Sequence, residues 1–268
     1  MKTKLVFLGV GNGGTMDLYN TCFVIQNEKG DFLVDTGGSI EIIKRLGLAE
    51  IDYRMIKHIF ISHSHTDHIL GLFWYFKKIS QYLKGKNDIE KINIYCNDVV
   101  YQSIKEIAKY ILPSSLMDII YSHFNFHILN DNDRYSINGV DYAFFDIMAR
   151  GTKQFGFECV LSNKTFAFLG DETLNPVLYE KIKNYDYVTH EAFCLEKEEN
   201  IFHAYEKNHS TTKSVSEVMN KLNIKNLILY HTEDTHGDQR QELYLDEAKD
   251  YFNRKVYVPN DMEEIKIL

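Results

Sequence analysis

A short segment between residues 58 and 71 carries four side chains that can bind metal ions. His63, His65, Asp67 and His68 fall within six residues, although the chain has only 11 histidines among 268 residues. Imidazole together with carboxylate suits zinc, iron or manganese. A polar loop whose histidines cap a helix and face water is the alternative, but it does not explain why so many ligand groups share one turn. We therefore interpret the segment as a metal-binding loop.

The sequence on either side of this loop predicts the elements that hold it. Residues 59–61 are apolar, which is typical of a short buried strand. From residue 69 to residue 83, apolar side chains recur near i, i+3, i+4 and i+7, the pattern of a helix packed on a core. The ligands are thus predicted to lie between a strand and a helix.

Three other predicted strands also end in a group that could bind or react. These strands stop at residues 169, 189 and 230, just before Asp171, Glu191 and His231. Strand ends along one edge of a layered α/β protein converge, and the loops there carry function. Taken alone, Asp171 is typical of a turn and His231 of an ordinary loop. Their joint placement favours a single metal site.

A glycine-rich run at residues 9–14 follows the first predicted strand. A dinucleotide-binding loop would lead directly into an apolar helix, whereas residues 19–25 here predict another strand. We therefore expect a turn that passes near the active site and not a nucleotide-binding loop. Farther along, Ser210 or Thr211 is predicted to cap a helix.

Composition excludes several classes of partner. The formal net charge is -8, which gives no general attraction to phosphate backbones or anionic lipid. Four widely spaced cysteines without a CxxC pair indicate reduced core residues. No signal peptide is evident, and no apolar run approaches the ~20 residues that span a bilayer. We expect a soluble cytoplasmic protein with no membrane partner.

The motifs together resemble the metallo-β-lactamase superfamily, whose metal signature is similar to His63-x-His65-x-Asp67-His68. Further segments resemble its ribonuclease Z-like branch, in the family's order and over nearly the whole chain: Leu8-Gly9-Val-Gly11, Asn20 before an apolar strand, Leu33-Val-Asp35-Thr-Gly37, Phe168-Leu-Gly-Asp171, His190-Glu191-Ala-Phe193, and His209-Ser-Thr211 before His231. The resemblance implies an α/β fold, a four-layer αββα sandwich with the metal site at one edge of the two sheets. Residues 1–268 would form a single domain.

The same resemblance implies a set of metal ligands. One ion would be held by His63 and His65, a second by Asp67, His68 and His231, and Asp171 would bridge them. Zinc is the expected metal, with manganese or iron as alternatives. Metal lowers the pKa of bound water from ~16 toward ~7, which provides hydroxide for hydrolysis at neutral pH.

Residues around the metals also receive expected roles. Glu191 and His209 match positions near the reacting phosphate, where His209 would donate a proton or stabilise charge, and Asp67 completes this catalytic group. Asp35 is expected to orient the histidine loop, because metal-bound imidazoles usually donate their other N–H to a carboxylate or carbonyl.

The chain departs from the family pattern at the third ligand histidine. No histidine occurs from residue 128 to residue 189. Aligning residues 154–157 with the family's glycine–aromatic pair puts Met148 in the histidine's place. Because a thioether is a poor ligand for zinc or manganese, we expect the His63/His65 metal to be loosely held, absent, or completed by Asp146 or water. One site is then secure and the other uncertain.

A second departure concerns the substrate. Ribonuclease Z enzymes that process tRNA carry a long arm between the third histidine and the bridging aspartate. Here Met148 and Asp171 are separated by only 23 positions, enough for two strands and a turn. We therefore expect a small-molecule or short nucleotide substrate and regard tRNA as unlikely.

Three functions remain open from the sequence. The leading hypothesis is a metal-dependent hydrolase that uses metal-activated water on a phosphodiester. The second is hydrolysis of a carboxyl ester, thioester or lactone, and the third is a non-catalytic metal-binding or sensor protein with an impaired first site. The resemblance is also compatible with a homodimer, although no interface is evident.

Overall fold

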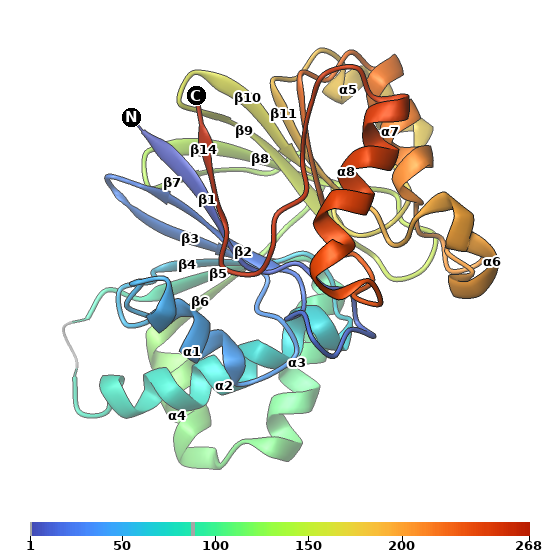
Figure 1. The fold of residues 1–268 in the computed structure, drawn as a ribbon. Helices are drawn as coiled ribbons and strands as arrows, with labels where there is room; N and C mark the ends of the chain where they lie inside the picture. Colours follow the sequence, from blue (N-terminus) through green and yellow to red (C-terminus); the bar gives the residue numbers. More distant parts are fainter. Residues whose placement is uncertain (1, 87–88) are drawn as a thin grey trace.

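Two seven-stranded sheets form the centre of the computed structural model, which describes residues 2–86 and 89–268 (Figure 1). The first sheet has the order β14-β1-β2-β3-β4-β5-β6, with β1 Thr3–Gly9, β2 Cys22–Asn27, β3 Gly30–Val34, β4 His58–Ile61, β5 Ile92–Cys96, β6 Phe124–Ile128 and β14 Glu264–Ile267. The second has the order β13-β12-β11-β10-β9-β8-β7, with β7 Arg134–Ile137, β8 Val140–Asp146, β9 Phe155–Leu161, β10 Lys164–Phe168, β11 Tyr187–Glu191, β12 Asn226–Tyr230 and β13 Lys255–Tyr257.

Both sheets follow the same pairing scheme. In the first, the pairs from β14 to β3 are antiparallel and those from β3 to β6 are parallel. In the second, the pairs from β7 to β10 are antiparallel and those from β10 to β13 are parallel. Parallel neighbours end at the same edge of their sheet, so the loops after β4, β10, β11 and β12 can contribute to one site.

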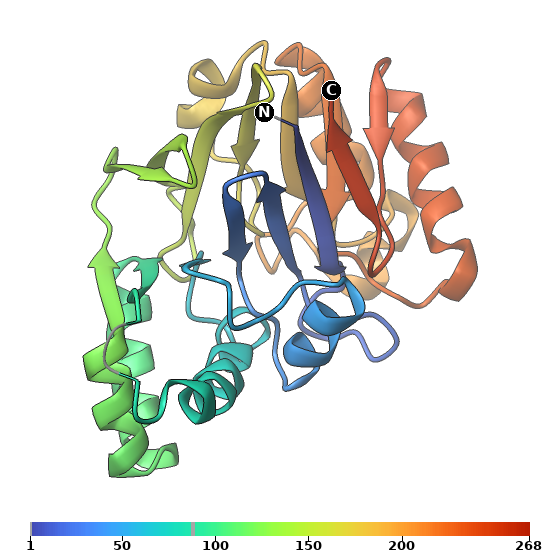
Figure 2. The same cartoon turned by 90° about the vertical axis from the view of Figure 1, so that its left-hand side faces the viewer.

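Helices cover the outer face of each sheet (Figures 1 and 2). The first sheet is covered by α1 Glu41–Leu48, α2 Thr66–Leu83, α3 Asp98–Ile111 and α4 Ser114–His123. Beside the second lie α5 Tyr179–Ile182, α6 Glu199–Phe202, α7 Thr212–Lys221 and α8 Arg240–Tyr251, with short 3-10 turns at Pro176–Leu178, Glu196–Glu198 and Gly237–Gln239. The capping prediction is confirmed for α7, where the Thr211 hydroxyl accepts a hydrogen bond from the Ser214 N–H.

Three apolar clusters separate the four layers. The first packs α1–α4 on the first sheet, the second fills the space between the sheets, and the third packs α5, α7 and α8 on the second sheet. Strand β4 shows why its sequence is apolar at every position. Ile59 and Ile61 point into the first cluster, whereas Phe60 points into the second. The predicted αββα sandwich is therefore confirmed.

The segment at residues 114–136, which the sequence pattern leaves unassigned, forms α4, β6 and β7. One predicted boundary differs, because the strand expected from residue 19 begins at Cys22. The final strand β14 is not predicted; it pairs with β1 and brings the two ends of the chain together (Figure 1). Among the described helices, none combines the length and apolar character required to cross a bilayer.

Candidate metal centre and active site

The ends of β4, β10 and β12 bring the predicted ligands together. His63 lies just beyond β4, and Asp67 and His68 lie in the first turn of α2. Asp171 follows β10 and His231 follows β12. All five side chains are buried, whereas His65, on the same loop, is exposed. The burial places most of the candidate ligands at the bottom of a pocket between the two sheet edges.

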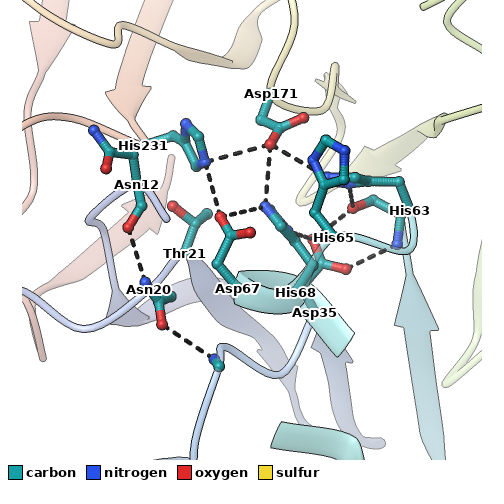
Figure 3. A network of polar contacts seen from close by, with 12 residues as sticks. Asn12, Asn20, Thr21, Asp35, His63, His65, Asp67, His68, Asp171 and His231 are labelled. Carbon is teal, nitrogen blue, oxygen red and sulfur yellow. Dashed lines mark hydrogen bonds and ion pairs between the residues drawn. The ribbon is translucent and has the colours of Figure 1, made fainter. Parts of the chain in front are cut away.

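Asp171 lies at the centre of this cluster (Figure 3). Its Oδ2 atom is 3.1 Å from His68 Nε2, 3.3 Å from His231 Nε2 and 3.4 Å from His63 Nε2. The Oδ2 atom of Asp67 is 3.2 Å from His68 Nε2 and 3.3 Å from His231 Nε2. One carboxylate therefore touches three imidazoles, and a second carboxylate touches two of the same three.

The donor set fits divalent metal ions. Two atoms that each bind one ion at ~2.1 Å lie roughly 3.0–3.4 Å apart, depending on the coordination geometry, and the contacts above fall in that range. The buried atoms His63 Nε2, His68 Nε2 and Asp171 Oδ1 have no hydrogen-bond partner within the described residues. Buried polar atoms are rarely left unpartnered unless a water or ion satisfies them.

Three groups of side chains in the described residues have ligand atoms close enough to hold an ion; one of them, Glu191, His209 and His231, lies beside the two that share Asp171. Of these two, one consists of Asp67, His68, Asp171 and His231, and the other of His63, His65 and Asp171. Asp171 is common to both, as expected for a bridging carboxylate.

Asp35 holds the histidine loop from behind. Its carboxylate accepts hydrogen bonds from Ser62 N at 2.8 Å, from Ser62 Oγ at 2.7 Å and from His68 Nδ1 at 2.8 Å. The Ser62 hydroxyl in turn lies 3.0 Å from His63 Nδ1. Because both Nδ1 atoms are engaged here, the Nε2 atoms of His63 and His68 remain free to face the cluster.

The charges of the cluster favour a bound cation. Burial would raise the pKa of Asp67, but His68 and His231 outweigh this effect and hold that pKa well below its usual range. Burial opposes ionisation of Asp171 as well, and His63, His68 and His231 again lower the pKa well below normal. Both carboxylates are consequently anionic at neutral pH.

His209 and Glu191 form a separate pair beside the metal ligands. Glu191 ends β11, and its Oε2 atom is 3.5 Å from His209 Nδ1. Phe193 stacks on the other side of His209, with ring centroids 4.4 Å apart and planes 6° apart. Burial alone would lower the pKa of His209, but the Glu191 carboxylate raises it to about 9. His209 is thus a cation at neutral pH.

These groups surround a pocket of about 240 Å³. Its lining is formed by Asn12, Gly13, Gly14, His65, Asp67, Asp171, Phe193, Lys207, His209, His231 and Glu233. The glycine-rich turn is one wall, as expected, and it lies close enough that a Cβ atom on Gly13 would be 3.1 Å from Asp67 Cγ. No local sequence signal identifies Lys207 or Glu233, because the fold alone brings them to the pocket.

The structure does not bring Met148 or Asp146 to either metal-binding group. Met148 is 48% exposed, and its backbone N–H is donated to the Asp146 carboxylate. It lines a different pocket, of about 190 Å³, together with Glu172 and Tyr179. Met148 belongs to the loop that connects β8 to β9. In that loop, Thr152 contacts the metal-binding histidines, because its Oγ1 atom is 3.1 Å from His65 Nε2.

Comparison with known proteins agrees with this fold and site. The chain is 24% identical to the ribonuclease Z of Archaeoglobus fulgidus over 98% of this chain and 97% of that protein. Its structure matches the metallo-β-lactamase fold protein YhfI from Bacillus subtilis with a TM-score of 0.79 and 15% identity, covering 99% and 100% of the two chains. It also matches a diphosphatase from the PhnP family with a TM-score of 0.74 and 16% identity, covering 100% and 98%.

These matches confirm the resemblance to the ribonuclease Z-like branch of the metallo-β-lactamase superfamily. Within that superfamily, a more specific family model, described as anti-Pycsar protein Apyc1, matches residues 3–249. The match covers both sheets except their edge strands β13 and β14, and it covers every candidate ligand. The chain therefore belongs to the anti-Pycsar protein Apyc1 family.

Proposed function

We propose that this protein is a metal-dependent phosphodiesterase that acts on a small phosphodiester or short nucleotide. The observation that carries the proposal is that the His209 cation lines the same pocket as two metal-binding groups that share Asp171. Such an arrangement would provide a phosphate in the pocket with positive charge from the imidazole as well as from the bound ions. The relatives support a hydrolase, and the names ribonuclease and diphosphatase both refer to bonds at phosphorus.

Different residues of the chain have different roles in the proposed hydrolysis. When bound, divalent ions supply a water whose pKa is lowered toward ~7, and they neutralise charge on the phosphate. Zinc is the metal we propose, with manganese or iron as alternatives. Asp67, Asp171 and the histidines would hold the ions, and Asp35 and Ser62 fix the ring orientation of His63 and His68.

His209 is placed to act on the leaving group. Glu191 keeps its imidazole protonated, and Phe193 holds the ring by stacking. A protonated imidazole at this position can donate a proton to the departing oxygen or stabilise its charge. His209 is itself partly buried, and it lines the same pocket as Asp67 and His231.

Size and charge favour a small substrate over tRNA. The pocket of about 240 Å³ suits a group of nucleotide size or smaller. Between Met148 and Asp171 the chain forms only a loop, β9, a two-residue turn and β10, which leaves no room for an arm. The net charge of -8 adds no attraction to a polyanion.

Hydrolysis of bis(p-nitrophenyl) phosphate by the purified protein tests the proposal. We expect turnover that stops on chelation and returns with added metal. Turnover should be abolished in Asp67→Ala and His68→Ala. It should be retained in the control Asp141→Ala, which replaces an exposed aspartate on β8. A dinucleotide, a cyclic mononucleotide, a p-nitrophenyl carboxyl ester and a precursor tRNA define the substrate class. Activity that survives in both ligand variants, or that is confined to the carboxyl ester, would refute the proposal.

A further inference from the structure

The imidazole of His65 differs from its neighbours in how it is held. His63 and His68 are buried and are fixed through Nδ1 by Ser62 and Asp35. His65 is exposed; its ring packs edge-on against His63, and its Nε2 atom lies 3.1 Å from Thr152 Oγ1. The two nitrogens of an imidazole have separate roles in a metal site, because one binds the ion and the other donates its proton to a nearby oxygen.

Applied to His65, this rule reverses the roles of its two ring nitrogens. The Thr152 hydroxyl can accept a hydrogen bond from the Nε2–H group of His65, in the tautomer whose Nδ1 carries no proton. His63 and His68 would then bind metal through Nε2, and His65 through Nδ1. In that tautomer, Thr152 occupies Nε2 and leaves Nδ1 available to an ion.

The loop that carries Thr152 is fixed on several sides. The Glu172 carboxylate accepts hydrogen bonds from the Arg150 and Gly151 N–H groups, and Glu172 directly follows Asp171. The base of the loop is closed by a hydrogen bond from Ile147 N to Gln154 O at 3.1 Å. On the opposite side, the Lys153 carbonyl accepts a hydrogen bond from Asn97 Nδ2 at 3.0 Å. A hydroxyl on so constrained a loop can position an imidazole.

We propose that Thr152 is the positioning residue for His65 and that its hydroxyl, in place of a third imidazole, is the contribution of this loop to the His63/His65 half of the site. That half then offers two imidazoles and the shared Asp171 carboxylate, whereas the other half offers four buried groups. The two ions consequently bind with unequal affinity, and Thr152 controls the weaker one. This inference rests on the metal dependence in the proposed function.

Metal titration of the full-length protein tests the inference without measuring activity. Zn²⁺ and Mn²⁺ are titrated in competition with a chromophoric chelator into wild type, Thr152→Val, Thr152→Ser and Thr235→Val, the last replacing an exposed threonine outside the site. We expect two classes of site, and we expect Thr152→Val to weaken only the weaker class, by ~10- to 100-fold. Thr152→Ser, which keeps the hydroxyl, and Thr235→Val should behave as wild type.

Nitrogen-15 NMR of the histidine rings in the zinc-loaded wild type gives a second readout, with His65→Asn used to assign the His65 signals. The proton of His65 should reside on Nε2, and those of His63 and His68 on Nδ1. A proton on Nδ1 of His65, or equal weakening of both sites in Thr152→Val, would overturn the inference while leaving the phosphodiesterase proposal intact. A protein that binds no metal would defeat both.

Discussion

The substitution Asp35→Asn tests the role of hydrogen bonding in the metal centre. Asp35 is 1% exposed, and its backbone lies in the left-handed region with φ of 56°, which asparagine tolerates. One of its oxygens accepts from Ser62 N, and the other accepts from both Ser62 Oγ and His68 Nδ1. An asparagine side chain has one oxygen and one NH₂ group, so in either orientation a donor faces a donor.

The two orientations have different consequences of similar size. If the NH₂ group faces Ser62 N, a buried hydrogen bond is lost. If it faces His68, the imidazole must move its proton from Nδ1 to Nε2, and Nε2 can then no longer bind metal. Loss of one hydrogen bond to a charged group costs ~1.5–3 kcal/mol of stability. Loss of a carboxylate behind a metal-bound histidine costs ~10- to 100-fold in metal affinity, which corresponds to roughly 1.4–2.8 kcal/mol.

Chelator competition and thermal unfolding measure both quantities, and Asp186→Asn is the matched control. Asp186 accepts hydrogen bonds from the N–H and hydroxyl of Thr165, at 2.9 and 3.0 Å, much as Asp35 does from Ser62. It lies just before β11, at the end of the strand opposite Glu191. We expect both variants to lose stability and only Asp35→Asn to lose metal affinity. Wild-type metal affinity in Asp35→Asn would refute the reasoning, and so would equal losses of metal affinity in the two variants.

Three further outcomes are expected. Gly13→Ala places a methyl group 3.1–3.3 Å from the Asp67 carboxyl group and should lower turnover of bis(p-nitrophenyl) phosphate. In the control Gly47→Ala, the added methyl group meets nothing within 4 Å, so turnover should be unchanged. Gly47→Ala should also stabilise α1 by ~0.5–1 kcal/mol, measured by denaturant unfolding. The pKa of His209, about 9, exceeds its unfolded value of ~6.5. Its proton therefore stabilises the fold fully below pH ~6.5, and this contribution is lost as the pH rises through about 9. In a series of unfolding curves, the stability difference between wild type and His209→Gln should be constant below pH ~6.5 and should shrink between that pH and about 9. Removal of metal should lower the melting temperature, because an ion present at 100 times its Kd adds ~2.7 kcal/mol to stability; an unchanged melting temperature after chelation would contradict the metal assignment.

Sequence patterns predicted the elements that carry the site better than those at the edges of the sheets. Strands β4 and β12 have apolar runs, and the structure ends them at the predicted residues, Ile61 and Tyr230. By contrast, β6 contains alternating polar residues and pairs only with β5, so its pattern is weak and its existence depends on a neighbour distant in the sequence. The same holds for β14, whose partner β1 lies at the other end of the chain.

The candidate ligands could be predicted because each follows a recognisable strand or lies in a dense motif. The residue that takes the place of the third ligand histidine could not be predicted in the same way. Alignment by the glycine–aromatic pair assumes a loop of fixed length, whereas the loop from Ile147 to Gln154 turns outward at Met148 and returns at Thr152. Only the three-dimensional path of that loop shows which side chain returns to the histidines.

The two halves of the site differ in how they connect the sheets, and this difference explains how the chain can lack one histidine. Asp67 and His68 come from the first sheet's side of the site, whereas Asp171 and His231 come from the second. An ion bound by these four therefore links both sheets with two ligands from each. The His63/His65 half draws only Asp171 from the second sheet, and a third histidine on the loop after β8 would have been the second ligand from that side. We therefore expect its absence to reduce the affinity for one ion without removing the connection between the sheets, because the shared Asp171 contacts both halves.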